Sequence, residues 1–349
     1  MAVTRVAFSW NGLPQYGARL IRQAIAELGG PCAVIGTKPT VPVLGMEAAL
    51  GQPVHWIDAD SRPRWADLGL EPPEVFLQSG WAYPAFNALG ADTKSHGGRV
   101  IGLMDNNWRA SFRQLVLGPA GFRLLYRHGF DAMLVPGKSG RRLARYYGMK
   151  RARLRMGMYG ADPALFYPEI PISQRPKEFL FVGRFTAIKG VASLCAGFIE
   201  FSKAHPEWTL RLCGSGEMRV SLPDHPGIIV EDFVQPEALR ARYNRARFFI
   251  LPSIEEAWGL VVHEAALCGS ALILSDKIGS TDDLAGCRNS VRFAAGDSGA
   301  LARALARAAA WTDARLEEAG KESRLLARRF GPARFADEVK RLVNSFAPR

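Results

Sequence analysis

The sequence predicts an α/β fold of two domains, each built on a parallel β-sheet. The chain has 349 residues, more than a single hydrophobic core usually serves. Its short apolar runs are continuously apolar rather than alternating, which is typical of strands buried on both faces. Longer segments with helical periodicity separate many of these runs, as in sheets covered by helices. We therefore expect two Rossmann-like domains in series.

The predicted strands fall into two sets, and most of them end in the Gly, Ser, Asp or Asn that favours a turn into a loop. The first set comprises 5–10, 32–37, 54–58, 74–80, 100–105, 132–137 and 153–160. The second set comprises 178–185, 209–216, 228–233, 248–253, 271–276 and 290–296. Each set predicts one sheet.

The predicted helices lie between many of these strands and after the last one. They comprise 16–28, 110–128, 138–148, 189–204, 236–246, 260–268, 298–328 and 332–346. A proline-rich stretch without a helical period, 160–178, is predicted as the linker between the two domains.

The composition excludes several classes of protein. Hydrophobic residues make up 48% and charged residues 22% of the chain, as in ordinary soluble domains rather than disordered ones. The N-terminus lacks the pattern of a signal peptide, and no run approaches the roughly 20 apolar residues that span a bilayer. The five cysteines are scattered without the spacing of a zinc or thioredoxin-like site. We therefore expect a reduced, cytoplasmic protein.

The net charge of +12 is concentrated in one segment. Between residues 109 and 155, twelve lysines and arginines stand against a single acid, Asp131, and they alternate with phenylalanine, tyrosine and leucine. Such a segment favours an anionic partner, either phosphate-bearing lipid or nucleic acid. Basic residues beside aromatic and leucine side chains suit an anionic membrane surface. We expect peripheral binding to the inner face of the cell membrane.

One strand-to-helix turn carries two cations. Residues 181–190 read FVGRFTAIKG, and the predicted strand ends at Gly183. Arg184 and Lys189 then bracket a short loop before a helix. Cations beside the free N–H groups of a helix start make a site suited to a diphosphate. The alternative is that both are solvated surface charges.

Two acids follow a later strand. Residues 252–265 read PSIEEAWGLVVHEA, in which Glu256 precedes and Glu264 follows the predicted start of a helix near Leu260. An acid near a helix N-terminus is favoured by the helix dipole, which explains one of the two. We expect both carboxylates to reach the same ligand site.

The segment EAWGLVVHE, from Glu256 to Glu264, resembles the E-x7-E signature of retaining glycosyltransferases of family four, which have the GT-B fold. GRFTAIKG, GSGE, the segment 232–253 and the segment 266–284 follow the order of that family. The resemblance covers essentially the whole second domain. It implies an acceptor-binding domain (1–165) and a nucleotide-sugar-binding domain (166–330) facing a central cleft, with a C-terminal helix (331–349) that packs back on the first domain.

The resemblance also implies a role for each donor-site residue. Arg184 and Lys189, after Gly183, would hold the diphosphate; Glu264 would bind the ribose hydroxyls and Glu256 would face the donor sugar. The backbone that approaches the sugar and the phosphates would be that of Ala257, Trp258, Gly259, Leu260 and Val261. The base would dock between Glu231 and Phe233.

The first domain matches the family only in outline. The segment SWNGLPQYGARL, with Asn11, Gly12 and Gly17, is the expected turn that faces the cleft. Many relatives place a His-Asp pair after the strand VIGLM; here the pair is Met104-Asp105, which leaves Asp105 as the candidate near the reacting carbon. The alternative is that Asp105 or Asn106 only caps the following helix.

The implied activity is the transfer of a sugar, with retention at its anomeric carbon, from a nucleotide-diphosphate sugar to a saccharide acceptor. We expect the acceptor to be lipid-linked and the role to be in bacterial-type surface-polysaccharide or glycoconjugate synthesis. The expected catalytic residues are Glu256, Asp105, Arg184 and Lys189. We expect no cofactor, no metal and no nucleic-acid partner.

Two other functions stay open at this point. A sugar-nucleotide epimerase of the same fold would convert its substrate without any acceptor. A basic nucleic-acid-binding protein would explain the segment 109–155 without using Glu256. An oxidoreductase with two dinucleotide-binding domains is disfavoured, because no G-x-G-x-x-G follows the first strand.

Overall fold

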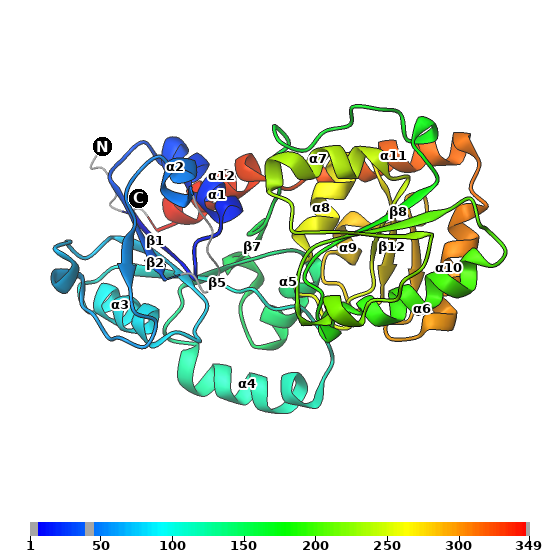
Figure 1. The fold of residues 1–349 in the computed structure, drawn as a ribbon. Coiled ribbons are helices and arrows are strands. Elements are labelled where there is room, and N and C mark those ends of the chain that lie inside the picture. The colour runs from blue at the N-terminus through cyan, green and yellow to red at the C-terminus, as the bar shows by residue number, and fades with distance from the viewer. Residues whose placement is uncertain (1–5, 39–44, 347–349) are drawn as a thin grey trace. The chain divides into compact units, whose positions relative to one another are not determined.

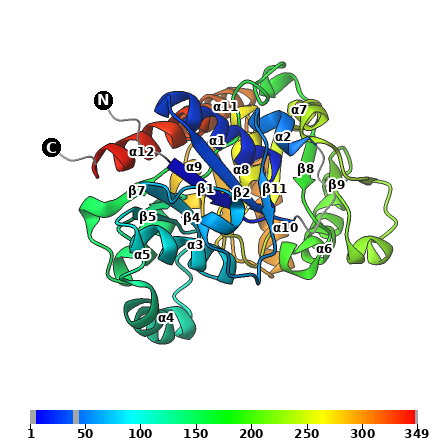
Figure 2. The same cartoon turned by 90° about the vertical axis from the view of Figure 1, so that its left-hand side faces the viewer.

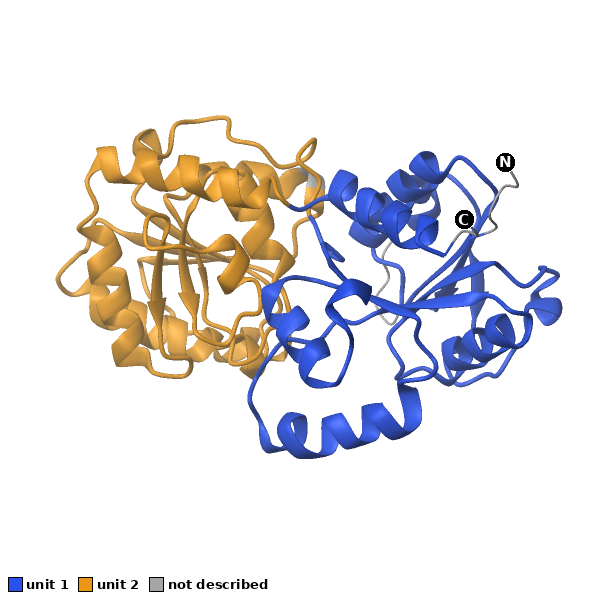
Figure 3. Ribbon diagram, turned by 180° about the vertical axis from the view of Figure 1, so that it is seen from behind, with its two compact units in different colours: residues 1–160, 330–349 blue, residues 161–329 orange. Residues whose placement is uncertain are grey.

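Two compact units make up the chain, and each contains one parallel sheet (Figure 3). The structure, a computed structural model, describes residues 6–38 and 45–346. The first unit contains residues 1–160 and 330–349, and the second contains residues 161–329. Arg5 of the first predicted strand, and 347–349 of the predicted C-terminal range, lie outside the described residues. The predicted ligands of the two domains stay predictions.

The sheet of the first unit has seven strands in the order β3-β2-β1-β4-β5-β6-β7 (Figure 1). Its strands are β1 (Val6–Trp10), β2 (Cys32–Thr37), β3 (His55–Ile57), β4 (Val75–Ser79), β5 (Arg99–Leu103), β6 (Ala132–Val135) and β7 (Leu154–Met156). Every neighbouring pair is parallel. Each strand falls within one of the predicted runs, except that β5 begins one residue earlier than predicted, at Arg99.

The sheet of the second unit has six strands in the order β10-β9-β8-β11-β12-β13. Its strands are β8 (Glu178–Val182), β9 (Thr209–Cys213), β10 (Ile228–Glu231), β11 (Phe248–Leu251), β12 (Ala271–Ser275) and β13 (Ser290–Phe293). These pairs are parallel as well. The predicted class, two parallel sheets in an α/β fold, is confirmed.

Helices alternate with the strands in both units. The α-helices are α1 (Gln15–Leu28), α2 (Met46–Leu50), α3 (Pro84–Ser95), α4 (Gly118–Gly121), α5 (Lys138–Tyr146), α6 (Val191–Ser202), α7 (Pro236–Arg245), α8 (Leu260–Leu267), α9 (Thr281–Leu284), α10 (Ser298–Ala309), α11 (Asp313–Ala327) and α12 (Pro332–Asn344). The π-helical turns η2 (Arg113–Leu117) and η3 (Phe122–Tyr126) extend α4 on both sides. The 3-10 turns are η1 (Trp65–Leu68), η4 (Arg151–Arg153), η5 (Ile172–Gln174), η6 (Ala187–Lys189) and η7 (Glu217–Ser221).

Three sequence predictions on the helices and the linker were wrong or incomplete. The single helix predicted over 298–328 is two helices, because Thr312 accepts a hydrogen bond from the Arg315 N–H and starts α11 anew. Helices α2, α3 and α9 were not predicted. The predicted linker 160–178 packs into the second unit from Ala161 onwards, where Arg175 is buried and donates to the carbonyl oxygen of Cys268 at 2.6 Å.

The last helix belongs to the first unit. Helix α12 packs along α1 (Figure 2), and its Phe335 and Val339 are fully buried. On the same helix, Glu338 pairs with Arg155 of β7 at 3.3 Å. The C-terminal helix therefore completes the first unit, as the sequence predicts.

Candidate functional site

The loops that follow β8, β9 and β11 hold the predicted donor motifs, and backbone hydrogen bonds join them. The Phe185 N–H donates to the Ser215 carbonyl at 2.7 Å, and the Ile254 N–H donates to the Ile188 carbonyl at 2.8 Å. Because β8 lies between β9 and β11 in a parallel sheet, all three loops leave the sheet at one edge. The motifs GRFTAIKG, GSGE and PSIEEAWG therefore form one assembly.

Two glycines allow these loops to approach so closely. A Cβ atom at Gly214 would overlap the carbonyl oxygen of Gly183, and one at Gly190 would overlap the carbonyl oxygen of Pro252. Gly190 also has a φ of +70°, in the left-handed region that side chains disfavour. These glycines are needed for contact between the loops themselves.

Lys189 and Glu256 form an ion pair across this assembly, between the Lys189 Nζ and the Glu256 Oε2. Their side chains are only 18% and 16% exposed. The loop after β12 fixes the backbone of Glu256, whose N–H donates to the Lys277 carbonyl at 3.2 Å and whose carbonyl accepts from the Gly279 N–H at 2.9 Å. Arg184 lies exposed at the start of the same cationic loop. The structure thus places Lys189, one of the two predicted diphosphate-binding cations, in contact with Glu256, one of the two predicted acids.

Glu264 lies one turn inside α8, which begins at Leu260 as predicted. Its side chain is buried, and its Oε2 accepts a hydrogen bond from the Tyr243 hydroxyl of α7 at 2.7 Å. Burial raises the pKa of Glu264 to about 7, although the hydrogen bond from Tyr243 acts in the opposite direction. This carboxyl group therefore gains and loses its proton near neutral pH.

The segment between the two acids is well packed. Trp258 and Gly259 are buried, whereas Ala257, Leu260 and Val261 are half-buried. Gly259 has a φ of +83° immediately before the first residue of α8. A glycine is favoured there, because only a residue without Cβ adopts this conformation at little cost.

His263 is a residue whose role the sequence analysis missed. Its Nδ1 accepts from the Ala161 N–H at 2.9 Å, and its Nε2–H donates to the Ala327 carbonyl at 2.8 Å. Burial lowers the pKa of His263 to about 4, which keeps the ring neutral and able to do both. His263 therefore ties the first residue of the second unit to its last helix. An isolated histidine in an apolar helix gave no signal for this.

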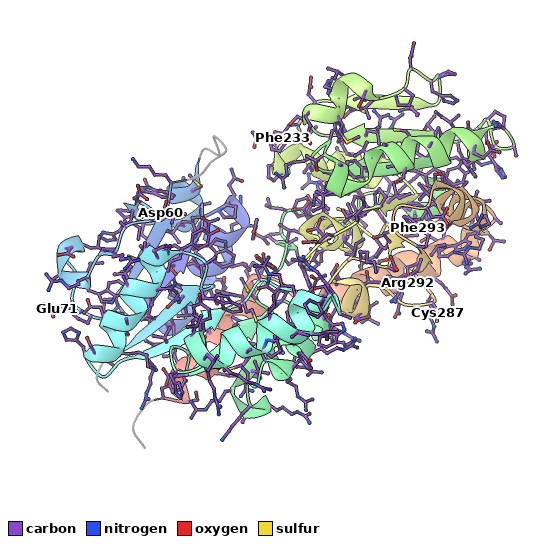
Figure 4. All side chains as sticks on the ribbon, turned by 90° about the horizontal axis from the view of Figure 1, so that it is seen from below. Asp60, Glu71, Phe233, Cys287, Arg292 and Phe293 are labelled. Atoms are coloured by element: carbon purple, nitrogen blue, oxygen red, sulfur yellow. The ribbon has the colours of Figure 1, made fainter. Side chains whose placement is uncertain are left out.

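The two side chains of the predicted base-docking stretch differ: Glu231 forms ion pairs, whereas Phe233 is exposed. Glu231 is paired with Arg211 and, at 2.6 Å, with Arg242. Burial raises the pKa of Glu231, but these arginines more than offset it, so the pKa lies below its usual value. Phe233 is 64% exposed and stands at the surface of the second unit (Figure 4). The Glu231 carboxylate is thus already paired with two arginines, whereas the Phe233 ring is exposed to solvent and could contact a ligand.

The first unit has its own pocket, of about 830 Å³, at the carboxyl ends of β1, β4 and β5. Its lining includes Trp81, Tyr83, Asp105, Arg109 and Tyr159. Burial, together with the neighbouring Tyr16 and Asp105 side chains, raises the pKa of Tyr159 well above its usual value. Aromatic rings and a carboxylate therefore share one wall of the pocket.

Asp105 does not cap the following helix. The helix begins at Phe112, seven residues later, and Asp105 is exposed on the loop after β5. The capping alternative for Asp105 and Asn106 is therefore wrong. Its position in the pocket lining leaves the catalytic role as a prediction.

The predicted glycine turn after β1 is shorter than expected. Asn11 and Gly12 lie in the turn, where the Thr37 hydroxyl donates to Asn11 Oδ1 at 2.7 Å and accepts from the Gly12 N–H at 3.0 Å. Gly17 lies inside α1, where its Cα faces the Trp10 ring and a Cβ would lie 3.2 Å from it. Gly17 therefore serves helix packing and is not part of the loop.

One triplet has the Asp-x-Asp spacing of some metal sites. It is Asp58-Ala59-Asp60, in the turn after β3, where the Asp58 carboxylate accepts from the Asp60 N–H at 2.9 Å. Among the residues that the structure describes, no group of three His, Cys, Asp or Glu side chains is placed to hold a metal ion. No helix in the described parts of the chain has the length and apolar character needed to cross a membrane.

Comparison with known proteins finds matches to most of the second unit. Residues 176–310 match the family model described as glycosyl transferases group 1. An uncharacterized glycosyltransferase of Methanocaldococcus jannaschii is 30% identical over 117 residues, which cover 32% of this chain and 30% of that protein. Glycogen synthase of Mycobacterium tuberculosis is 33% identical over 137 residues, which cover 37% and 33%. The chain spans about a third of the length of these curated relatives.

Solved structures extend the likeness to the whole fold. Sucrose-phosphate synthase from Thermosynechococcus elongatus has a TM-score of 0.74 at 19% identity, with 98% of each chain covered. HepE of Anabaena, solved in complex with UDP and glucose, has a TM-score of 0.75 at 14% identity, with 98% of this chain and 100% of that chain covered. At this identity the likeness concerns the fold. The chain thus has the GT-B fold, and its residues 176–310 match the group 1 glycosyl transferases.

Proposed function

We propose that the chain is a retaining glycosyltransferase that moves a sugar from a nucleotide-diphosphate sugar to a saccharide acceptor. The observation that carries this proposal is the contact between Lys189 and Glu256 at the strand ends of the matched segment. A partly buried cation and acid that satisfy each other in the free protein can separate onto a diphosphate and a sugar. A single nucleotide-diphosphate sugar carries both groups, the diphosphate for Lys189 and the sugar for Glu256.

The other donor-site residues have matching chemistry. Arg184 is exposed on the same loop as Lys189 and would share the charge of the departing diphosphate. Glu264, as a carboxylate, would accept hydrogen bonds from the ribose hydroxyls in competition with Tyr243. The exposed ring of Phe233 offers a face on which a base can stack. The donor is a substrate, so this proposal includes no cofactor.

The chemical step in this proposal is metal-independent. The acceptor oxygen forms a bond to the anomeric carbon while the bond from that carbon to the diphosphate oxygen breaks. The bonding electron pair leaves with the diphosphate, which also takes the acceptor proton, so attack and departure share one face of the sugar. Arg184 and Lys189 stabilise the charge on the leaving group, and Asp105 is the proposed acid for the cationic carbon. Catalysis then rests on positioning and electrostatics.

The acceptor would bind in the pocket of the first unit. Trp81 and Tyr83 give it apolar faces, and Asp105 can accept a hydrogen bond from a hydroxyl group. A saccharide has both kinds of surface, with C–H groups on its ring faces and hydroxyls at its edge. We propose a lipid-linked saccharide, in a pathway that builds a surface polysaccharide or glycoconjugate.

A thermal-shift screen tests the donor site first. UDP, GDP, ADP, CMP and dTDP are each added to the full chain and to Glu264→Ala. A ligand at about 100 times its dissociation constant stabilises the fold by roughly 2.7 kcal/mol. We expect one nucleotide to raise the melting temperature of the wild-type chain and to lose most of that effect in the variant. If none of the five nucleotides raises it, the proposal loses its support.

The reaction type is tested with the sugar nucleotide of the base so identified. Proton NMR of the first product formed reports the configuration of the anomeric carbon. We expect the configuration of the donor to be kept and the reaction to need an acceptor saccharide. Conversion of the sugar nucleotide with no acceptor present would instead favour the epimerase alternative.

A further inference from the structure

The helix of residues 112–126 has an exposed apolar surface, here called its outer face. The outer face consists of Phe112, Leu115, Val116, Leu117, Leu124 and Leu125, which are between 36% and 81% exposed. These six account for nearly half of the fourteen large apolar side chains that are exposed in the described residues. In the first unit this helix, labelled α4, lies apart from the sheet and open to one side (Figures 1 and 2). A cluster of this kind marks an interaction surface.

The opposite side of the same helix holds it to the first unit. Phe122 is buried and stacks on Tyr147 with 5.7 Å between ring centroids. Gly118 sits so close to Tyr147 that a Cβ would overlap the phenol oxygen. The Tyr146 hydroxyl donates to the Leu115 carbonyl at 2.8 Å. The helix is therefore anchored without its outer face, whose leucines are left for another partner.

The helix that carries the outer face is also basic. Arg113, Arg123 and Arg127 belong to this helix or follow it directly, and all three are exposed. Arg113 also lines the pocket of the first unit, and the Arg123 guanidinium donates to the carbonyl oxygens of Tyr146 and Tyr147 at 3.4 Å. The single acid between residues 109 and 155, Asp131, is 8% exposed and is held by Lys94 at 2.9 Å and Arg99 at 3.4 Å. No acid of this segment therefore opposes the arginines. Aliphatic side chains flanked by guanidinium groups complement a layer of apolar tails beneath anionic phosphates.

We propose that the helix 112–126 docks on an anionic phospholipid bilayer through its outer face, with its arginines on the lipid phosphates. This helix also forms a wall of the 830 Å³ pocket, through Gln114, Gly118 and Gly121 and through Leu117, which lies where the outer face meets the pocket. Docking therefore brings that pocket to the membrane surface, where a saccharide joined to a lipid would lie. This second step rests on the proposed function, whereas the docking itself does not.

A nucleic acid fits the outer face less well. Single strands bind by stacking bases on aromatic rings, and duplexes bind mainly through phosphate contacts. Five of the six outer-face side chains are aliphatic, so they offer neither an aromatic ring for a base nor a charge for a phosphate. The combination of leucines and arginines matches a lipid surface better, because leucines can contact the apolar tails and arginines the anionic phosphates.

Vesicle flotation tests the docking on the full chain. Vesicles of equal parts phosphatidylcholine and phosphatidylglycerol are compared with vesicles of phosphatidylcholine alone, at low salt. We expect wild-type chain to float with the anionic vesicles, and L124E combined with L125E to bind them at least about tenfold more weakly, because two charges replace the most exposed apolar contacts. The matched control is V220E combined with L325E, which changes two exposed apolar residues of the second unit. We expect that control to float as wild type does.

The charge component is measured separately. Exchanging Arg123 and Arg127 for glutamine is expected to weaken binding by roughly fivefold for each arginine removed. Each variant is first checked for an unchanged melting temperature and an unchanged response to the donor nucleotide. If a variant no longer floats but still responds to the donor nucleotide, the change has affected membrane docking and not donor binding.

Two results would overturn the docking proposal. One is that the wild-type chain fails to float with anionic vesicles at low salt. The other is that L124E with L125E floats as wild type does while duplex DNA competes with the vesicles for the chain. That second pattern would describe a surface for polyanions in general, and the nucleic-acid alternative would replace the lipid surface.

Discussion

Glu264 combines a proposed ligand role with a pKa of about 7. Its carboxyl group is almost completely buried, and its charged form has the Tyr243 hydroxyl as a hydrogen-bond donor. Because burial penalises the charge, the pKa lies at about 7 instead of near 4.5. A ribose hydroxyl that donates to this group favours the ionised form. The proposed contact therefore links nucleotide binding to release of the Glu264 proton.

The linkage gives nucleotide affinity a pH dependence. Above about pH 7 Glu264 is already ionised in the free protein, and the affinity stays level. Below that pH binding has to expel a proton, so the dissociation constant rises by up to about tenfold per pH unit. Titration calorimetry with the nucleotide found in the screen, between about pH 8 and pH 6, measures this. Glu264→Gln removes the titration and should flatten the profile; an equally steep profile in that variant would assign the proton to another group.

At the scale of elements, the proposed donor site depends on loops that touch through their backbones. The turns after β8 and β9 meet at Gly183 and Gly214, and the Gly183 N–H also donates to the Cys213 carbonyl at 3.0 Å. Any side chain at residue 214 would push these turns apart. The loops are therefore held in place before a ligand arrives, which reduces the entropy that binding must overcome.

Gly214→Ala tests this loop contact. The added methyl group meets a backbone oxygen, and the φ of +156° is unfavourable for alanine. We expect a loss of about 2–4 kcal/mol in the free energy of unfolding, from strain and overpacking together. Gly29→Ala is the matched control, since its φ is +68° but no atom lies within 4 Å of the added Cβ; it should cost only about 1–2 kcal/mol. Chemical denaturation measures both, and equal losses would remove the steric argument.

Sequence patterns predicted the strands well, because buried parallel strands are short, continuous apolar runs. Helix α3 was not predicted, because residues 84–95 contain many small and polar side chains and only two large apolar ones, Phe86 and Leu89, which make a weak apolar stripe. The break between α10 and α11 was missed because the alanine-rich pattern runs on past Trp311, and only the cap at Thr312 marks it. Helix starts at Leu260 and Pro332 followed glycines and were predicted correctly.

The candidate site was predictable as a set of residues but not as a set of contacts. Glycine, lysine and glutamate at strand ends indicate a ligand site, because loops at one edge of a parallel sheet converge. No spacing rule says that Lys189 meets Glu256, 67 residues further along the chain, or that Glu231 is taken up by arginines. Likewise, the pocket of the first unit depends on where the helix 112–126 packs, and only the fold decides that.

At the scale of the whole molecule, the second unit begins and ends at neighbouring points. His263 binds residue 161 through one ring nitrogen and residue 327 through the other. In the first unit, Gly160 and Gly331 lie so close that a Cβ on Gly160 would overlap the backbone of Gly331. The chain therefore leaves the first unit and re-enters it at almost the same place.

The second unit should fold as a separate protein. Residues 161–329 contain a complete six-stranded sheet with its covering helices and all the proposed donor residues of the matched segment. We expect this piece, expressed alone, to unfold in one cooperative transition and to show the nucleotide-dependent rise in melting temperature of the full chain. A piece that is folded yet does not respond to the nucleotide would mean that the first unit supplies part of the donor site.

Because Gly160 and Gly331 lie in close contact, the second unit is inserted into the first through a single short junction. A piece whose two ends touch can be exchanged for another of the same kind without rebuilding its host, because the host needs only one short junction to be closed. The proposed donor-binding unit can in this way be recombined with a first unit that has a different pocket and a different helix in place of 112–126. Swapping residues 161–329 between relatives would then produce chimaeras that take the donor of one parent and the acceptor of the other.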